Sequence, residues 1–429
     1  MFLLEKLLGW KIYVLKGGSK FVKELKEKTR KNSKKHLQKE FKHNLMKELM
    51  KKIKQDMDDK GFKIRPLAKK VGVDRSVITD GIITGKTAEM KLDAFMKIMD
   101  VVYENLEERQ EVIRSFIEIS QNDLNIRKSL VYCQGTGEYD VIANLVKIHQ
   151  GDRLLNKYIR VYELFNKRNQ NIKKGQPLID EMDEQLFSSD AELQVVINIL
   201  YALSMHDTFN IRAMNPYMDK VEKSLLEVHD NFINNWLTMF FDERMAYVNL
   251  FDDNLELCRQ KCEKLLKEAN NVPLIYTTSM CCIGESYMFD DKFLSEKWIS
   301  DSIAYLDKHG VSRESRKYKA FNTTLNYLYI EFGFNLDKIN FDYIDTSELG
   351  YYIGLYEDKE KGLEMIYNLV KERGSSPFTD YYIARINEDL EGLEKALMRF
   401  ERVANYHYAK AVRRTIELLK MKQGEVERV

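Results

Sequence analysis

Apolar residues recur along most of the chain at the three- and four-residue spacing of amphipathic helices. Between Lys42 and Lys54, the residues Leu45, Leu49 and Ile53 lie on one such face. A second face comprises Leu92, Phe95, Met96, Met99 and Val102. No strand-type alternation interrupts the later segments, and only five prolines and 20 glycines occur in 429 residues. The pattern predicts an all-α fold.

The stretch from Ile64 to Lys86 predicts two short helices joined by a tight turn. Ala68 is small enough for a second helix to cross closely, and Gly72 can adopt the left-handed conformation that the turn needs. Asp74 is a suitable N-cap for the second helix. The spacing resembles the helix-turn-helix of phage repressors at Ala68, Gly72, Val73, Asp74, Ser76, Ile78, Gly85 and Lys86.

In that motif the second helix enters the major groove of DNA. The resemblance places Arg75, Ser76, Thr79 and Asp80 against bases and Lys69, Lys70 and Lys86 against phosphates. Arg75 is the candidate for a bidentate guanine contact. Gly81 departs from the motif because it weakens the second helix by roughly 1 kcal/mol relative to Ala. A plain helical hairpin with solvated charges is the alternative.

Charge is distributed unevenly along the chain. Residues 1–91 carry 25 Lys and Arg against 11 Asp and Glu, a net of +14, so the remainder nets −13 within the overall +1. A basic head on an acidic body indicates binding to a polyanion, either nucleic acid or an anionic membrane surface. Residues 1–40 are expected to be a basic extension: a loosely ordered segment, a phosphate-binding arm, a membrane-surface helix or an upstream mis-assigned start.

The N-terminal apolar run does not predict a membrane partner. Glu5, Lys6 and Lys11 interrupt this run, and no cleavage site of the A-x-A type follows it. We therefore expect no export signal and no membrane-spanning segment.

A loose repeat begins at about residue 240. Its units start at Tyr247, Cys281, Tyr351 and Tyr381, and each has a helix, an acidic turn and a second amphipathic helix. The turns fall near Asp252, Asp290, Asp358 and Glu388. Their mean spacing is close to the ~34 residues of tetratricopeptide repeats, whose stacked hairpins form a superhelix with a concave, peptide-binding face.

These patterns predict four regions. They are a basic extension at residues 1–40, a DNA-binding domain at 41–90, a helical linker with the first part of a solenoid at 91–240, and a peptide-sensing and dimerisation region at 241–429. The acidic body would suit a peptide that carries a positive charge.

The sequence contains no catalytic pattern. A Walker loop, an HExxH motif and a nucleophile elbow are absent, and the seven histidines are scattered. The five cysteines (Cys133, Cys258, Cys262, Cys281 and Cys282) lack framework spacing, which indicates reduced thiols in the cytosol. Cys258 and Cys262 continue a helical stripe, and we interpret them as small core residues rather than metal ligands. We expect a non-enzymatic protein without cofactor or metal.

A helix-turn-helix followed by degenerate helical repeats resembles the peptide-sensing regulators of Gram-positive bacteria and their mobile elements. Within that group the chain resembles the arbitrium-peptide receptor (AimR) family of temperate bacilliphages. The resemblance covers roughly residues 42–429 and is carried by Ile126–Val146, Leu250–Leu266, Ile283–Ser295 and Tyr381–Tyr408. It implies a homodimer in the host bacterial cytoplasm that binds double-stranded phage DNA and activates a gene opposing lysogeny. A short secreted and re-imported peptide would end that activation.

The resemblance also implies site residues. Dimerisation would use the stripe Val412, Ile416 and Leu419 on the last helix. Peptide contacts would fall at Glu285, Met288, Ser375 and Asn405, with Asn322 and Asn326 as further candidates. Three of these positions differ from the family: Glu285 and Ser375 replace asparagines, and Asn405 replaces an aspartate. A family arginine that faces the ligand falls at Leu274 in this chain. The differences indicate another peptide or another alignment, and ordinary inter-helix positions are the alternative.

Two other functions remain open at this point. One is a helical-repeat scaffold that acts by peptide-controlled protein–protein interaction without binding DNA, its basic head being solubilising or bound to an acidic partner. The other is a host or plasmid quorum-sensing regulator of the same build. Steeply salt-dependent binding to duplex DNA would exclude the scaffold, because phosphate contacts release counterions.

Overall fold

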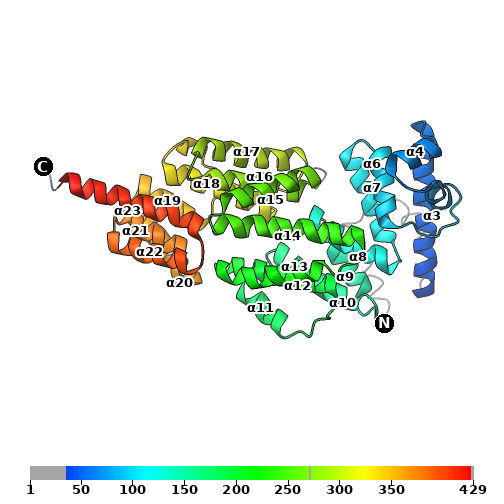
Figure 1. The fold of residues 1–429 in the computed structure, drawn as a ribbon, viewed down its shortest axis with the longest axis horizontal. Helices are drawn as coiled ribbons and strands as arrows, with labels where there is room; N and C mark the ends of the chain where they lie inside the picture. The colour runs from blue at the N-terminus through cyan, green and yellow to red at the C-terminus, as the bar shows by residue number, and fades with distance from the viewer. Residues whose placement is uncertain (1–34, 270–271, 427–429) are drawn as a thin grey trace. The chain divides into compact units, whose positions relative to one another are not determined.

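The computed structural model describes residues 35–269 and 272–426, and every regular element in these ranges is a helix (Figure 1). The all-α prediction is therefore confirmed. The chain divides into two compact units, Met1–Asn166 and Lys167–Val429. Within the described ranges, no helix combines the length and the hydropathy that crossing a membrane requires.

The first unit begins with the helix that the apolar periodicity predicts. Leu45, Leu49 and Ile53 are all buried on α3. The helices of this unit are α3 (Lys35–Asp59), α4 (Ile64–Val71), α5 (Arg75–Ile78), the π-helical turn η1 (Thr79–Ile83), α6 (Leu92–Val102), α7 (Leu106–Ile119), α8 (Asp123–Thr136), α9 (Tyr139–His149) and most of α10 (Asn156–Asn169).

Helices after residue 91 are part of the same compact unit as the expected DNA-binding domain. The Tyr103 hydroxyl donates to the Asp56 carboxylate at 2.5 Å. The side chain of Asn125 on α8 accepts from the Leu92 amide at 2.9 Å and donates to the Met90 carbonyl at 2.7 Å. The boundary expected at residue 91 is therefore not a boundary between compact units, because α6 and α8 hold the segment that precedes it.

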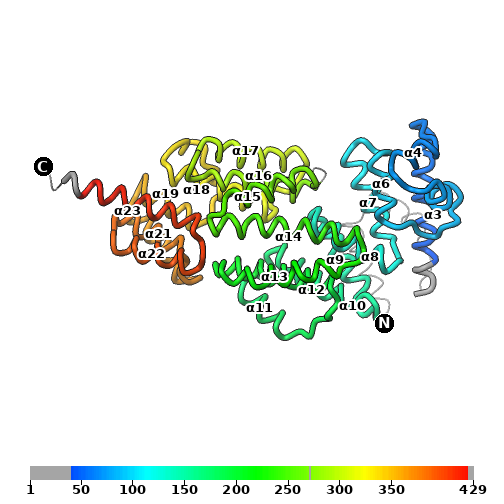
Figure 2. Tube along the Cα trace, in the orientation of Figure 1, coloured from blue at the N-terminus to red at the C-terminus, as the bar shows by residue number. Residues whose placement is uncertain are grey.

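The second unit consists of successive helical hairpins. Figure 2 shows α14 to α17 as neighbours in chain order, in agreement with their packing contacts. The helices are α11 (Gln176–Asp183), α12 (Ala191–Asp207), η2 (Ile211–Met214), α13 (Asn215–Leu225), α14 (Asn231–Phe251), α15 (Leu255–Glu268), α16 (Pro273–Tyr287), α17 (Lys292–Lys308), α18 (Arg316–Phe332), η3 (Leu336–Lys338), η4 (Phe341–Tyr343), α19 (Thr346–Tyr356), α20 (Lys359–Arg373), α21 (Pro377–Ile386), α22 (Leu390–Arg402) and α23 (Tyr406–Val426).

The acidic turns of the sequence repeat lie between the helices of four hairpins. Asp291 caps α17 by accepting from the amides of Phe293 and Leu294 at 3.1 and 3.0 Å. Asp358 caps α20 by accepting from the Lys361 amide at 3.0 Å. A cap of this kind typically stabilises a helix by about 1 kcal/mol. In these two hairpins the acidic residue therefore fixes where the second helix begins.

Two glycines allow the backbones of α19 and α20 to pack directly against each other. A Cβ atom on Gly362 would lie 2.3 Å from the Gly354 nitrogen and 2.4 Å from its Cα. Side chains larger than hydrogen are excluded from this crossing because a backbone cannot rotate away as a side chain can. The spacing of Gly354 and Gly362 thus sets the geometry of the third predicted hairpin.

Candidate functional site

The turn between α4 and α5 has the conformation that its sequence predicts. Gly72 has φ 68° and ψ 38°, the left-handed region in which glycine is not strained. The Val73 amide donates to the Ala68 carbonyl at 3.1 Å. Asp74 then caps α5 by accepting from the Ser76 amide at 2.7 Å. Ile78 is fully buried, so the inward face of the second helix is the predicted one.

The residues predicted to face DNA differ in how accessible they are. Five are exposed and two are half-buried: the exposed ones are Lys69, Lys70, Arg75, Ser76 and Lys86, and the half-buried ones are Thr79 and Asp80. The Ser76 hydroxyl donates to Asp74 at 2.6 Å, so its proton is already used within the cap. The Thr79 hydroxyl is buried and has no hydrogen-bond partner within the described chain. Arg75 is therefore the most available of the predicted base-reading side chains.

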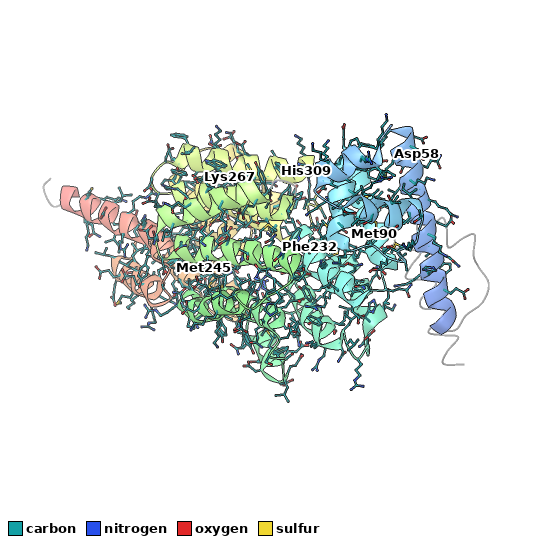
Figure 3. The ribbon with its side chains drawn as sticks, turned by 45° about the vertical axis from the view of Figure 1, so that its right-hand side comes forward. Asp58, Met90, Phe232, Met245, Lys267 and His309 are labelled. Carbon is teal, nitrogen blue, oxygen red and sulfur yellow. The ribbon has the colours of Figure 1, made fainter. Side chains whose placement is uncertain are left out.

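Close packing explains why position 81 is a glycine, and the neighbouring sequence does not reveal this packing. A Cβ on Gly81 would lie 2.5 Å from Cγ and 2.6 Å from Sδ of Met90, the residue labelled in Figure 3. The second helix is α-helical only over Arg75–Ile78 and continues as the π-helical turn η1. The glycine that departs from the repressor motif thus permits a close contact between η1 and the segment that precedes α6.

In the second unit, Glu285 lies in a buried polar cluster between α16, α14 and α23. Its carboxylate accepts from the hydroxyls of Tyr408 at 2.8 Å and Tyr247 at 3.3 Å, and from the Cys281 thiol at 3.6 Å. The His407 ring nitrogen Nε2 lies 3.0 Å from the Glu285 carbonyl oxygen. Burial raises the pKa of Glu285 to about 7, although the bonds from Tyr408 and Tyr247 oppose this effect.

Two other predicted peptide contacts lie on the helix termini next to this cluster. Asn405 is buried at the start of α23 and accepts from the Tyr408 amide at 3.3 Å, so it acts as a cap. Met288, directly after α16, has no exposed surface. The chain itself covers both side chains in this conformation.

The remaining candidates belong to separate places. Asn326 exchanges two hydrogen bonds with the backbone of Asn340, at 3.0 and 2.9 Å, and Asn322 accepts from the Asn340 side chain at 3.4 Å. These asparagines therefore hold the segment between α18 and α19. Ser375 is exposed, and its hydroxyl accepts from Arg399 at 2.7 Å. Of the six predicted peptide contacts, the structure brings Met288 and Asn405 next to the Glu285 cluster, and it brings Asn322 and Asn326 together at Asn340.

The stripe predicted for dimerisation is part of the chain's own core. Val412, Ile416 and Leu419 are 0%, 8% and 9% exposed. The large apolar side chains that α23 exposes, among those described, are Leu418 and Met421. Sequence periodicity does not distinguish the two cases, because an amphipathic stripe looks the same whether its partner is the same chain or a second copy.

A buried ionic cluster surrounds Glu331, and no sequence pattern predicts it. Its carboxylate binds Arg385 at 2.5 Å and Arg414 at 3.1 Å, and it accepts from Tyr351 and Tyr381, each at 3.0 Å. Both tyrosines are visible in the sequence as the first residues of repeat units. Glu331, their acidic partner on α18, lies outside the four predicted repeat units, so no sequence pattern points to it.

Comparisons with known proteins identify the family. The sequence profile described as AimR transcriptional regulator-like matches residues 108–417. An uncharacterized Bacillus anthracis protein, pXO2-35, is 24% identical over 251 residues, which are 57% of this chain and 92% of that protein.

Two solved structures share the fold. The structure of phAimR with a ligand has a TM-score of 0.66 at 16% identity and covers 77% of this chain and 97% of its own. SeMet-phAimR has a TM-score of 0.56 at 16% identity and covers 88% and 99%. The profile begins within α7, so it does not include the α4–α5 turn. Because it spans well over half of the sequence, the chain belongs to the AimR transcriptional regulator-like family.

Proposed function

We propose that the protein is a sequence-specific, DNA-binding transcriptional regulator that a short signalling peptide switches. Membership of a transcriptional regulator-like family supports a regulatory role, and it also supports the expectation that the protein is not an enzyme. The observation that carries DNA binding is the α4–α5 turn, which presents exposed Lys69, Lys70, Arg75 and Lys86 in the part of the chain that nets +14.

In this proposal, α5 lies in the major groove and Arg75 reads a guanine. Arg75 is the first residue after the Asp74 cap, and its side chain is exposed. The lysines contact phosphates and set the orientation without reading sequence. A homodimer in the host cytoplasm would place two such helices on the two halves of a symmetric operator.

The peptide would bind in the second unit, against the surfaces that α16 and α23 contribute. Residues 92–429 net −13, which favours a peptide that carries positive charge. Glu285 and Asn405 are buried in the present conformation, so the peptide must bind better to a second conformation in which these helices separate. Its differential affinity for the two conformations would then shift the population and change DNA binding.

Fluorescence anisotropy on labelled fragments that flank the gene tests DNA binding. Wild-type protein should prefer one fragment, and Arg75→Ala should lose about 1–3 kcal/mol of that preference, or roughly 5- to 150-fold. Lys97→Ala is the matched control, because Lys97 is an exposed cation on α6 in the same unit. A preference that survives Arg75→Ala would show that α5 does not read the operator.

The peptide is tested with synthetic segments of the product of the short reading frame downstream of the gene. DNA affinity by anisotropy and solution shape by small-angle X-ray scattering are measured with and without each peptide. At least one peptide should change both quantities. If no peptide changes either one, the sensing part of the proposal is wrong while DNA binding is unaffected.

A scaffold without DNA binding is the second candidate. Stacked helical hairpins are typical of proteins that bind extended partners, and the family profile does not include residues 64–86. Binding to every fragment without salt dependence, or no binding at all, would favour the scaffold.

A further inference from the structure

Three buried thiols converge between α15 and α16. Cys258 and Cys262 lie one helical turn apart on α15, and Cys282 faces them from α16. Their sulfur atoms all lie within 4.8 Å of one another, and the sulfurs of Cys258 and Cys282 are 3.5 Å apart. The three side chains are at most 1% exposed. The sequence shows only the first two on a common stripe.

The spacing of the sulfurs fits a bound ion. A metal about 2.3 Å from each of three sulfurs holds them roughly 3.8–4.0 Å apart. The observed triangle therefore needs only small side-chain rotations to close around an ion. Its surroundings are apolar, with Ala246, Leu250 and Ile283 in the same cluster. Water is thus poorly placed to act as an additional ligand.

One cationic side chain lies next to the three thiols, namely Arg259, which follows Cys258 on α15. Arg259 is held close by its bond to the Ser286 hydroxyl at 2.8 Å. Thiolate is the form that binds metals.

We propose that Cys258, Cys262 and Cys282 form a binding site for one thiophilic d10 cation, Cu(I) in preference to Zn²⁺. Soft thiolate ligands select such ions. Structural zinc takes four ligands, whereas no fourth His, Cys or carboxylate donor of the described residues joins this group. Cu(I) accepts three sulfurs in a plane. A bound ion would link α15 to α16 and release the protons that the thiols carry.

The experiment uses the full-length protein, reduced and kept without oxygen. Cu(I) is supplied as its bicinchoninate complex, and transfer to the protein is followed by loss of the colour of that complex. One equivalent should transfer, and X-ray absorption should show a first shell of three sulfurs at about 2.3 Å. Zn²⁺ is titrated in parallel with a chromogenic chelator. Failure of the wild-type protein to take up either ion, or a shell without sulfur, would overturn the site, and tighter binding of Zn²⁺ would overturn the preference.

Two adjacent cysteines on α16 provide the matched comparison. Cys282→Ala should weaken metal binding by more than about 100-fold because it removes a direct ligand. Cys281→Ala should bind as the wild type does, since the Cys281 thiol donates to Glu285 and is outside the triangle. Equal affinities of the two variants would refute the assignment. If Cys282→Ala does not fold, the number of sulfur ligands that X-ray absorption gives for the metal in the wild-type protein decides whether the site exists.

Discussion

Replacing Glu285 with Gln keeps the shape of the side chain but fixes it in an uncharged form. The wild-type carboxyl is 5% exposed, and burial raises its pKa from 4.5 to about 7. Tyr408 and Tyr247 donate to it, and their hydroxyls can rotate to serve an amide instead. We therefore expect Glu285→Gln to fold and to imitate the protonated wild-type protein.

The raised pKa makes the free energy of unfolding depend on pH. Between pH 4.5 and about 7 the folded chain retains a proton on Glu285 that the unfolded chain has lost, so a rise in pH favours unfolding. The stabilising contribution is complete below pH 4.5 and is lost as the pH rises through about 7. A shift of this size corresponds to about 3 kcal/mol at 1.36 kcal/mol per unit.

Urea unfolding followed by circular dichroism at several pH values from 5 to 8 measures the effect. The difference in unfolding free energy between wild type and Glu285→Gln should change by about 2–3 kcal/mol across this range, in favour of the variant at high pH. Parallel curves for the two proteins would refute the reasoning.

Glu348→Gln is the control. Burial also raises the pKa of Glu348 to about 7, and its carboxylate accepts from Tyr382 on α21 rather than from the residues that bind Glu285. Both variants should therefore alter the pH dependence of stability. Only Glu285→Gln should also alter the pH dependence of peptide affinity, which separates the binding role from the general effect of a buried carboxyl.

Three further substitutions test other parts of the structure. Gly362→Ala should lower the free energy of unfolding in urea by about 1–3 kcal/mol, because the new methyl group would collide with Gly354. This loss should occur although alanine favours helices over glycine by about 1 kcal/mol. A gain in stability would contradict the close crossing of α19 and α20. Gly81→Ala should lower the melting temperature of the first unit, and it should do so by less when Met90→Ala has already removed the contact. Equal losses in the two backgrounds would show that the contact is not the cause. Lys69→Ala should weaken binding to all DNA sequences alike and lower the slope of log affinity against log salt by about 1. A sequence-dependent loss would place Lys69 on a base instead.

The parts of the fold that the sequence predicts are those fixed by near neighbours. Gly72 adopts its left-handed conformation and Asp74 caps α5 because both depend only on adjacent residues. Asp291 and Asp358 cap their helices at two of the acidic turns that the repeat predicts, again through adjacent residues. Apolar periodicity reveals which face of a helix is buried, and Leu45 on α3 is an example.

Contacts between distant segments could not be predicted in this way. Glu285 receives hydrogen bonds from Tyr247, 38 residues away, and Tyr408, 123 residues away, and no local pattern pairs these positions. Cys282 joins Cys258 only because α15 packs on α16. Periodicity also does not say what covers a buried face, which is why Val412 was expected at a dimer interface and lies in the chain's own core.

The buried carboxylate of Glu331 has a consequence for the order of events during synthesis. One of its two cationic partners, Arg414, is 83 residues further along the chain. At about 5–20 residues per second, the ribosome delivers that arginine roughly 4–17 s after the glutamate. Arg385 on α21 is translated before Arg414, so it alone can pair the carboxylate in the later part of this interval. Full burial of the carboxylate therefore waits until α23 has emerged. The last of the described helices thus completes a layer begun five helices earlier.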